Sequence, residues 1–110
     1  MKIHQGDIVI CAFQGTYGKP RPVVVVQSDL FNETHASVTL CPVTSELIDA
    51  PLFRVKLEPK PSNGLKNPCQ VMVDKIVSIP REKIAQKIGK VSAHEWDLIQ
   101  DALCRWLAIS

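Results

Sequence analysis

Apolar side chains recur at every second position along much of this chain, a spacing that predicts β-strands. Residues 23–26 are the exception, because four consecutive valines are too apolar for a strand with one face in water. This run predicts a central strand that is covered on both faces. Residues 8–13, 36–43 and 53–57 predict three further strands, the last with a clean alternation of apolar and polar side chains.

Residues 69–79 predict one more strand, with a defect in its middle. The alternation slips at Asp74 and Lys75, which indicates a bulge or kink that presents two charged groups. Pro80 ends this strand. Residues 81–88 are then predicted to form a short helix that Gly89 closes.

The end of the chain predicts an amphipathic helix. Ser92 and Glu95 have the spacing of a capping box, in which each side chain bonds to the other residue's backbone N–H. Apolar side chains then follow at helical spacing, at Trp96, Ile99, Leu103 and Trp106. We expect this helix to lie against the sheet, with its tryptophan face in the core or in a dimer interface.

These elements predict a mainly β fold of about five mostly antiparallel strands with a C-terminal helix. A strongly curved sheet or small barrel, with the helix packed on it, fits this order of elements. The chain has 110 residues, of which 45% are hydrophobic, enough for a core of its own. No linker or repeat interrupts it, so we expect residues 1–110 to form a single domain.

Charge and apolar runs restrict the environment. The formal net charge is +2, which permits contact with nucleic acid without arguing for it. The longest unbroken apolar run, residues 8–13, is too short to span a bilayer. The first residues lack the apolar region of a signal peptide. We therefore expect a cytoplasmic protein without a membrane partner.

The four cysteines are scattered and contain no C-x-x-C pair. A metal site would require close pairs, and a secreted disulfide scaffold would require more cysteine. The three histidines match no ligand spacing either. We expect no metal and no cofactor, and thiols that serve as small core side chains.

Arg21 stands between two prolines at the beginning of the valine strand. Proline fixes its own φ and favours extended backbone in the residue before it, so this guanidinium leaves a stiff segment. A fixed arginine suits recognition of a phosphate or carboxylate by its planar fork. The alternative is a surface arginine that keeps a sticky strand soluble.

Two neighbouring segments extend this candidate site. The glycine-containing loop of residues 15–19 is either a plain connector or a lid beside Arg21. Thr44 and Ser45 follow the third predicted strand, where two hydroxyl groups are either functional or ordinary turn chemistry.

The chain resembles the MazF/PemK family, the toxins of type II toxin–antitoxin systems, over nearly its whole length. The resemblance is carried, in matching order, by the C-terminal helix and by residues 6–9, 21–27, 42–45, 63–65 and 73–76. It implies a small SH3-like barrel, a homodimer, and metal-independent cleavage of single-stranded RNA at short sequences. It also implies an antitoxin partner whose flexible tail blocks the site.

The catalytic pair of this family is the arginine of an Arg-Pro motif and a threonine at a strand end. Arg21 and Thr44 stand at these positions, and the loop of residues 15–19 would border the RNA groove. The chain departs from the family pattern twice. Lys75 stands where glutamine is usual, and Met72 stands where some members have an arginine.

RNA can be cleaved without a metal when its own 2′-OH attacks the adjacent phosphorus, which leaves a 2′,3′-cyclic phosphate and a 5′-OH. Arg21 is suited to stabilise the phosphorane with two parallel N–H bonds. Thr44, together with Ser45, is suited to donate a hydrogen bond to a non-bridging oxygen.

Asp74 is the first candidate for the general base, although the Lys75 cation beside it would lower the pKa of a carboxyl. His35 is a second candidate by its chemistry alone. A nucleophilic Cys69–His pair has no support from spacing.

Tyr17, in the lid loop, is the expected stacking partner for an RNA base. The other candidates for RNA contact are Lys19, Ser28, Ser45 and Lys75.

Two other functions fit the same fold. One is a gyrase poison of the CcdB kind, whose activity lies in the C-terminal tail, here residues 105–110. The other is a catalytically inactive homologue that only binds an antitoxin, an idea that Met72 and Lys75 support.

Overall fold

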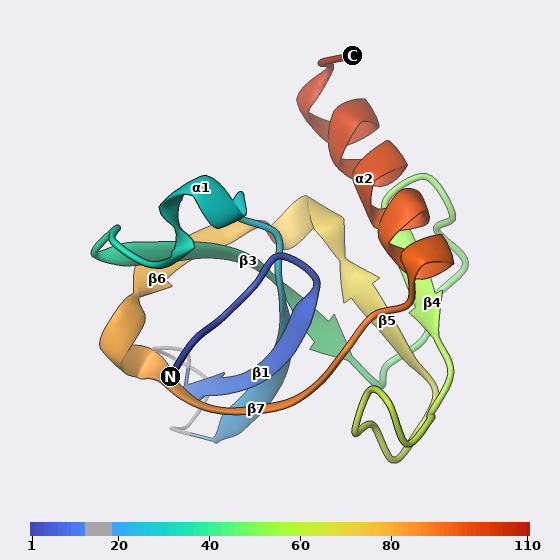
Figure 1. The fold of residues 1–110 in the computed structure, drawn as a ribbon. Coiled ribbons are helices and arrows are strands. Elements are labelled where there is room, and N and C mark those ends of the chain that lie inside the picture. The colour runs from blue at the N-terminus through green and yellow to red at the C-terminus, as the bar shows by residue number, and fades with distance from the viewer. Residues whose placement is uncertain (13–18) are drawn as a thin grey trace.

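The computed structural model describes residues 1–12 and 19–110 (Figure 1). Its strands are β1 (Asp7–Ala12), β2 (Pro20–Val25), β3 (Ser37–Thr44), β4 (Arg54–Leu57), β5 (Cys69–Met72), β6 (Val77–Pro80) and β7 (Ile84–Lys90). Its helices are α1 (Asp29–Asn32) and α2 (Ala93–Leu107), and its 3₁₀ turns are η1 (Val73–Lys75) and η2 (Arg81–Lys83).

The strands form one antiparallel sheet in the order β4-β5-β3-β2-β1-β7, and β6 also pairs with β3. Strand β3 therefore has two partners along one edge, β6 beside its first half and β5 beside its end. Within the described residues, the terminal strands β4 and β7 do not pair with each other, so the curved sheet stays open. The predicted curved antiparallel sheet with a C-terminal helix is confirmed.

Strand β2 is central, as the valine run predicts, and its side chains alternate between two cores. Val23 and Val25 face the core inside the curve of the sheet, which also contains Val9, Cys11, Val38, Leu40 and Ile79. Val24 and Val26 face the core beneath α2, which also contains Cys41, Val43, Val71, Ile99 and Ala102. Both faces of β2 are covered because each has its own apolar layer.

Helix α2 begins at the predicted capping box. The Glu95 N–H donates to Ser92 Oγ at 3.1 Å, and the Ser92 N–H donates to Glu95 Oε1 at 2.7 Å. Ile99 and Ala102 are buried, but Trp106 is 50% exposed, with its ring centroid 6.0 Å from that of Phe53. The apolar stripe is thus buried only near its beginning, since the C-terminal end of α2 extends beyond the sheet (Figure 1). Neither helix of the described residues has the length and apolar character to cross a membrane.

The predicted helix over residues 81–88 is wrong. Only η2 is helical there, and residues 84–90 form β7, which pairs with β1. Gly89 lies inside this strand, where a Cβ would come within 2.5 Å of the Asn63 backbone. It is therefore needed for close approach, and it does not cap a helix.

Two further boundaries differ from the prediction. The strand predicted over residues 69–79 divides into β5 and β6, and η1 lies between them at the predicted kink. The sheet consequently has seven strands in the described residues, where about five were predicted. The turn after β2 contains the short helix α1, which the pattern did not indicate.

Asn63 holds the loop that packs on Gly89. Its Oδ1 accepts from the N–H groups of Lys60 and Leu65, both at 3.0 Å, and its Nδ2 donates to Glu58 O at 2.8 Å. The side chain is buried, so each of these groups depends on it.

We expect Asn63→Ala to lower the free energy of unfolding by about 3 kcal/mol, because it removes the buried side chain that bonds to three partly buried backbone groups. Urea denaturation followed by tryptophan fluorescence would measure the change. Asn67→Ala, at an exposed position of the same loop, is the matched control and should change stability by less than about 0.5 kcal/mol. Equal stability of the two variants would contradict this role.

Candidate functional site

A cavity of about 360 Å³ opens where β2 begins and β3 ends. Pro22, Val43 and Leu65 contribute buried or half-buried apolar wall. Arg21 and Ser45 contribute exposed polar groups. The cavity therefore combines an apolar wall with polar groups at the position predicted for a site.

Arg21 is the second residue of β2, and its backbone pairs with Cys11 of β1. The prolines on either side of it are also within the paired strand, opposite Ala12 and Ile10. The guanidinium is exposed, while its backbone belongs to the sheet. The stiff support predicted for this arginine is thus provided by strand pairing as well as by proline.

The two hydroxyl residues at the end of β3 stand differently toward Arg21. Thr44 stands opposite Gln70 in the β3–β5 register, and strand partners share a face. The β2–β3 register extends from Val25↔Leu40 to Val23↔Pro42, and continuing it by two residues sets Arg21 level with Thr44. Ser45, directly after β3, lines the cavity together with Arg21, whereas Thr44 is not among the lining residues.

The hydroxyl group of Thr44 has a defined role in its own turn. Thr44 Oγ1 accepts a hydrogen bond from the Glu46 N–H at 3.1 Å. Because a hydroxyl group both accepts and donates, its hydrogen stays available for another acceptor. Thr44 can thus donate to a phosphate oxygen without breaking this turn.

Asp74 lies in η1, apart from the cavity. Its Oδ1 is buried and has no hydrogen-bond partner among the described residues. Burial, and then the negative charge of Asp74, raise the pKa of the Cys41 thiol to about 12, so this carboxylate lies near Cys41. Cys41 precedes Thr44 by three residues, about 10 Å along an extended strand. Lys75, next in the turn, is exposed.

The remaining predicted contacts are dispersed. Lys19 is exposed directly before β2, close in sequence to Arg21. Ser28 lies at the other end of β2, where its Oγ accepts from the Leu30 N–H at 3.1 Å and caps α1. The structure does not bring Ser28 to the cavity, so its contact with RNA stays a prediction. Tyr17 lies outside the described residues, as do residues 15–18 of the predicted lid.

His35 is exposed after α1, where its Nδ1 accepts from the Ser37 N–H at 3.2 Å. It is not among the residues that line the cavity beside Arg21.

Three of the four cysteines are core thiols as predicted, whereas Cys104 is only half-buried and belongs to neither core. All four are free, and Cys11, Cys41 and Cys69 are buried. Burial raises the pKa of the Cys11 thiol to about 11, and it also raises that of Cys69. Cys69 borders the cavity and donates through Sγ to Asn67 O at 3.1 Å. A thiol with a raised pKa is protonated at neutral pH, so Cys69 is a poor nucleophile.

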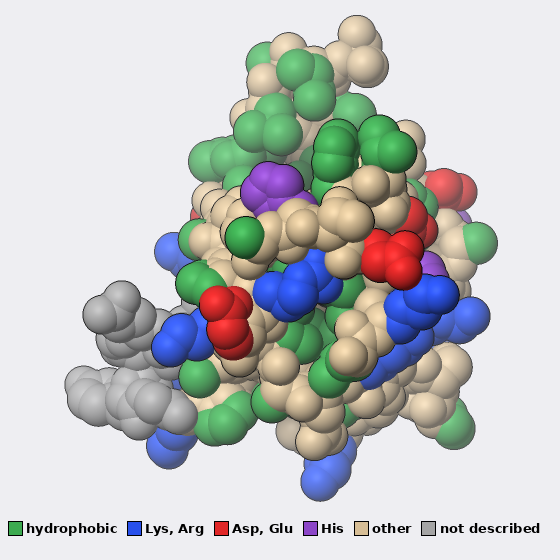
Figure 2. Space-filling model, turned by 60° about the vertical axis from the view of Figure 1, so that its left-hand side comes forward, with side chains coloured by type: hydrophobic (Ala, Val, Ile, Leu, Met, Phe, Trp, Pro, Cys, Tyr) green, Lys and Arg blue, Asp and Glu red, His purple; other side chains and the backbone are tan. Residues whose placement is uncertain are grey.

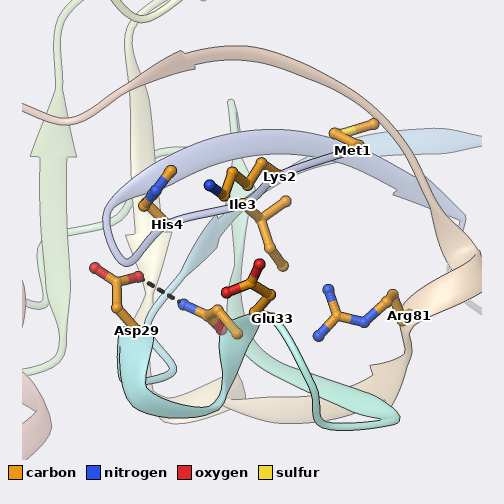
Figure 3. Close-up of a pocket in the computed structure, with 8 residues that line it drawn as sticks. Met1, Lys2, Ile3, His4, Asp29, Glu33 and Arg81 are labelled. Atoms are coloured by element: carbon orange, nitrogen blue, oxygen red, sulfur yellow. Dashed lines mark hydrogen bonds between the residues drawn. The ribbon is translucent and has the colours of Figure 1, made fainter.

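A second cavity, of about 500 Å³, lies at the other end of β2, between the N-terminal residues and α1 (Figure 3). Glu33 and Arg81 extend toward it from opposite walls (Figure 3). Arg81 donates through Nε and Nη2 to His35 O, at 3.1 and 2.9 Å. Asp29 accepts from the Gln5 N–H and from Asn32, and these bonds lower its pKa. The polar side chains of Asp29, Asn32 and Arg81 are thus already engaged in hydrogen bonds within the protein.

Figure 2 shows that Lys and Arg side chains are interspersed with Asp and Glu on the face it draws. They do not gather there into one basic patch, in agreement with the small net charge.

Sequence reasoning missed the side chains that hold the segment after Thr44. Gln70 and Arg54 bond to the backbone of residues 46–48. The signal was weak, because a polar residue at every second position of a strand is ordinary. Only the register shows that Gln70 stands opposite Thr44.

The architecture defines the class of protein first. The MazE–MazF complex of Deinococcus radiodurans (Form-III) has the same fold, with a TM-score of 0.83 over 100% of both chains and 24% identity. The Mycobacterium tuberculosis toxin MazF-mt6 matches with a TM-score of 0.82 over 94% of this chain and 98% of that one, at 22% identity. The chain thus has the fold of these small toxins.

Sequence comparison then identifies the family. The family described as PemK-like, MazF-like toxin of type II toxin-antitoxin system matches residues 4–107. A probable endoribonuclease MazF of Mycolicibacterium smegmatis is 38% identical over 109 residues, which cover 98% of this chain and 99% of the relative. The chain belongs to the PemK/MazF family of toxins, as the resemblance indicated.

We expect iodoacetamide at neutral pH to modify Cys104, which is half-buried, before the three buried cysteines. The reason is that burial both blocks access and keeps thiols protonated. Mass spectrometry of proteolytic peptides over time would measure the order. In concentrated urea all four should react at similar rates, and rapid labelling of Cys69 in the folded protein would contradict the assignment.

Proposed function

We propose that this chain is a toxin that cleaves single-stranded RNA at specific short sequences without a metal and is neutralised by a cognate antitoxin. The observation that carries the proposal is the β2–β3 register. Continued by two residues, it places Arg21 opposite Thr44 at the point where β2 begins and β3 ends. Family membership supports it, since the M. smegmatis relative is named an endoribonuclease. The Deinococcus neighbour is a complex of MazF with MazE, which supports an antitoxin partner.

In the proposed reaction the 2′-OH of one nucleotide attacks the adjacent phosphorus. The new O2′–P bond forms as the P–O5′ bond breaks, the 2′ proton passes to the general base, and the leaving oxygen takes up a proton from water to give a 5′-OH end. The Arg21 fork donates two parallel N–H bonds to the phosphorane, where negative charge accumulates. Thr44 donates its free hydroxyl hydrogen to a non-bridging oxygen, while the Glu46 N–H orients its oxygen.

Asp74 is the proposed general base. Asp74 is half-buried, and its Oδ1 has no hydrogen-bond partner among the residues that the structure describes, so a carboxylate lone pair is not already in use. The bound RNA would have to bring its 2′-OH toward η1, beyond the level of Arg21 and Thr44. Lys19 and Lys75, both exposed, are proposed to contact phosphates on either side of the reacting one, and Ser45 the nucleotide in the cavity.

The exposed end of α2 supports the proposed homodimer. Trp106, Leu107 and Ile109 are 49–60% exposed. Leu52 is also exposed and lies near them, since its carbonyl accepts from Arg105 Nε at 3.0 Å. Contiguous exposed apolar side chains of this kind mark protein interaction surfaces. A cytoplasmic location, where the RNA substrate is found, completes the proposal.

We expect Arg21→Ala to reduce RNA cleavage by about 10²–10³-fold, because it removes the donors aimed at the phosphorane. Arg21→Lys should recover little, since a point charge lacks the bidentate fork. Cleavage of a defined RNA in EDTA, with mapping of both new ends, measures rate, chemistry and sequence preference together.

Lys83→Ala, at an exposed position of η2, is the matched control for loss of one positive charge. Intact RNA after incubation with the wild-type protein would overturn the proposal, as would undiminished cleavage by Arg21→Ala. Intact RNA with inhibited DNA supercoiling would favour a gyrase poison instead.

We expect Asp74→Asn to lower cleavage by about 10²-fold or more while the protein becomes no less stable. The amide cannot take up the 2′ proton, yet it removes a charge that is partly buried without a partner. Single-turnover cleavage and urea denaturation measure the two effects. Full activity of Asp74→Asn would remove Asp74 from the mechanism and leave Arg21 and Thr44 in it.

A further inference from the structure

Residues 45–49 follow Thr44 without forming a helix or strand. Their backbone is nevertheless held by side chains from β4 and β5. Two residues make these bonds, Gln70 of β5 and Arg54 of β4. Residues 45–49 are therefore held against the sheet by side chains of two other strands rather than by strand pairing of their own.

Gln70 bonds to both backbone groups of one residue. Its Oε1 accepts from the Ile48 N–H at 3.1 Å, and its Nε2 donates to Ile48 O at 2.8 Å. This paired arrangement resembles one rung of an antiparallel ladder, with a side-chain amide in place of a strand. It sets both the position and the orientation of the Ile48 peptide groups.

Arg54 connects the two ends of the same segment. Its Nη1 donates to Gln70 Oε1 at 2.9 Å and to Glu46 O at 3.2 Å. The N–H of Glu46 donates in turn to Thr44 Oγ1 at 3.1 Å. The backbone of Glu46 is thus held at its carbonyl by Arg54, and its N–H orients the hydroxyl group of Thr44.

We propose that Gln70 and Arg54 are positioning residues that hold residues 45–49 so that the Thr44 hydroxyl is directed at the scissile phosphate. This inference rests on the proposed nuclease function and adds two residues to it. Gln70 stands opposite Thr44 on the same face, so the side chain that anchors residues 45–49 comes from the strand partner of Thr44. An error of about 1 Å in such a group is enough to reduce catalysis by about 10²-fold.

The charge of Arg54 is consistent with this role. Its guanidinium is half-buried, its Nε has no partner among the described residues, and its recorded bonds go to a carbonyl and an amide. Because both of these partners are neutral, they do not cancel the positive charge of Arg54, which contributes to the electrostatic potential around it. That charge lies near the face where the phosphate would bind.

The test compares Gln70→Leu and Gln70→Glu with the wild-type protein in single-turnover cleavage of a short RNA. Leucine removes every bond, whereas glutamate keeps the acceptor for Ile48 and Arg54 and loses only the donor to Ile48 O. We expect Gln70→Leu to lower the maximal rate by about 10- to 100-fold with a concentration dependence changed less than about threefold. Gln70→Glu should be intermediate.

Three further measurements separate positioning from other roles. Amide hydrogen exchange should show that Ile48 loses protection in Gln70→Leu, while unfolding stability changes little. Arg54→Met combined with Gln70→Leu should be no slower than the slower single variant, because both act through one network. Gln100→Leu, at an exposed position of α2, is the matched control and should behave as wild type.

A weakened RNA affinity with an unchanged maximal rate would overturn the proposal, since Gln70 would then contact RNA directly. Unchanged kinetics despite lost protection at Ile48 would overturn it as well. If the wild-type protein cleaves no RNA, the nuclease function itself fails, whereas hydrogen exchange at Ile48 still tests the anchoring.

Discussion

The register of β2 between β1 and β3 is the constraint on which the rest of this structure depends. Valines at consecutive positions face two different apolar cores, so a slip by one residue would exchange every side chain between them. The same register keeps Arg21 beside Cys11 and brings it level with Thr44. The position of Arg21 is therefore a consequence of the burial of residues 23–26, which follow it in the same segment.

Polar interactions complete what the sheet begins. The strand carries Thr44 to the correct level, but the direction of its hydroxyl depends on the turn at Glu46. That turn is held in place by Arg54 of β4 and Gln70 of β5, two strands that follow β3 in the sequence. Asp74 is different, because one of its oxygens is buried and has no partner within residues 1–12 and 19–110, a feature that is costly to folding and that calls for an explanation.

Much of the fold could be predicted because the strongest signals are local. The valine run, the capping box at Ser92 and the defect at Asp74 each depend on neighbouring residues. The predicted helix at residues 81–88 failed for a specific reason. Ile84 and Ile88 are four positions apart, the spacing of one face of a helix. In β7 they instead pack against different cores, because the register with β1 shifts between them. Pairing with β1, far away in sequence, decided between helix and strand.

The amino-acid sequence by itself determined the residue types of the site, the central strand and the order of motifs that define the family. Tertiary structure alone decided how each hydroxyl stands toward Arg21. Thr44 and Ser45 are adjacent and equally suited by chemistry, but the β2–β3 register sets Thr44 level with Arg21, and Ser45 lines the cavity that Arg21 also borders. Both positions depend on the pairing of β3 with its neighbours, and so does the role of Gln70.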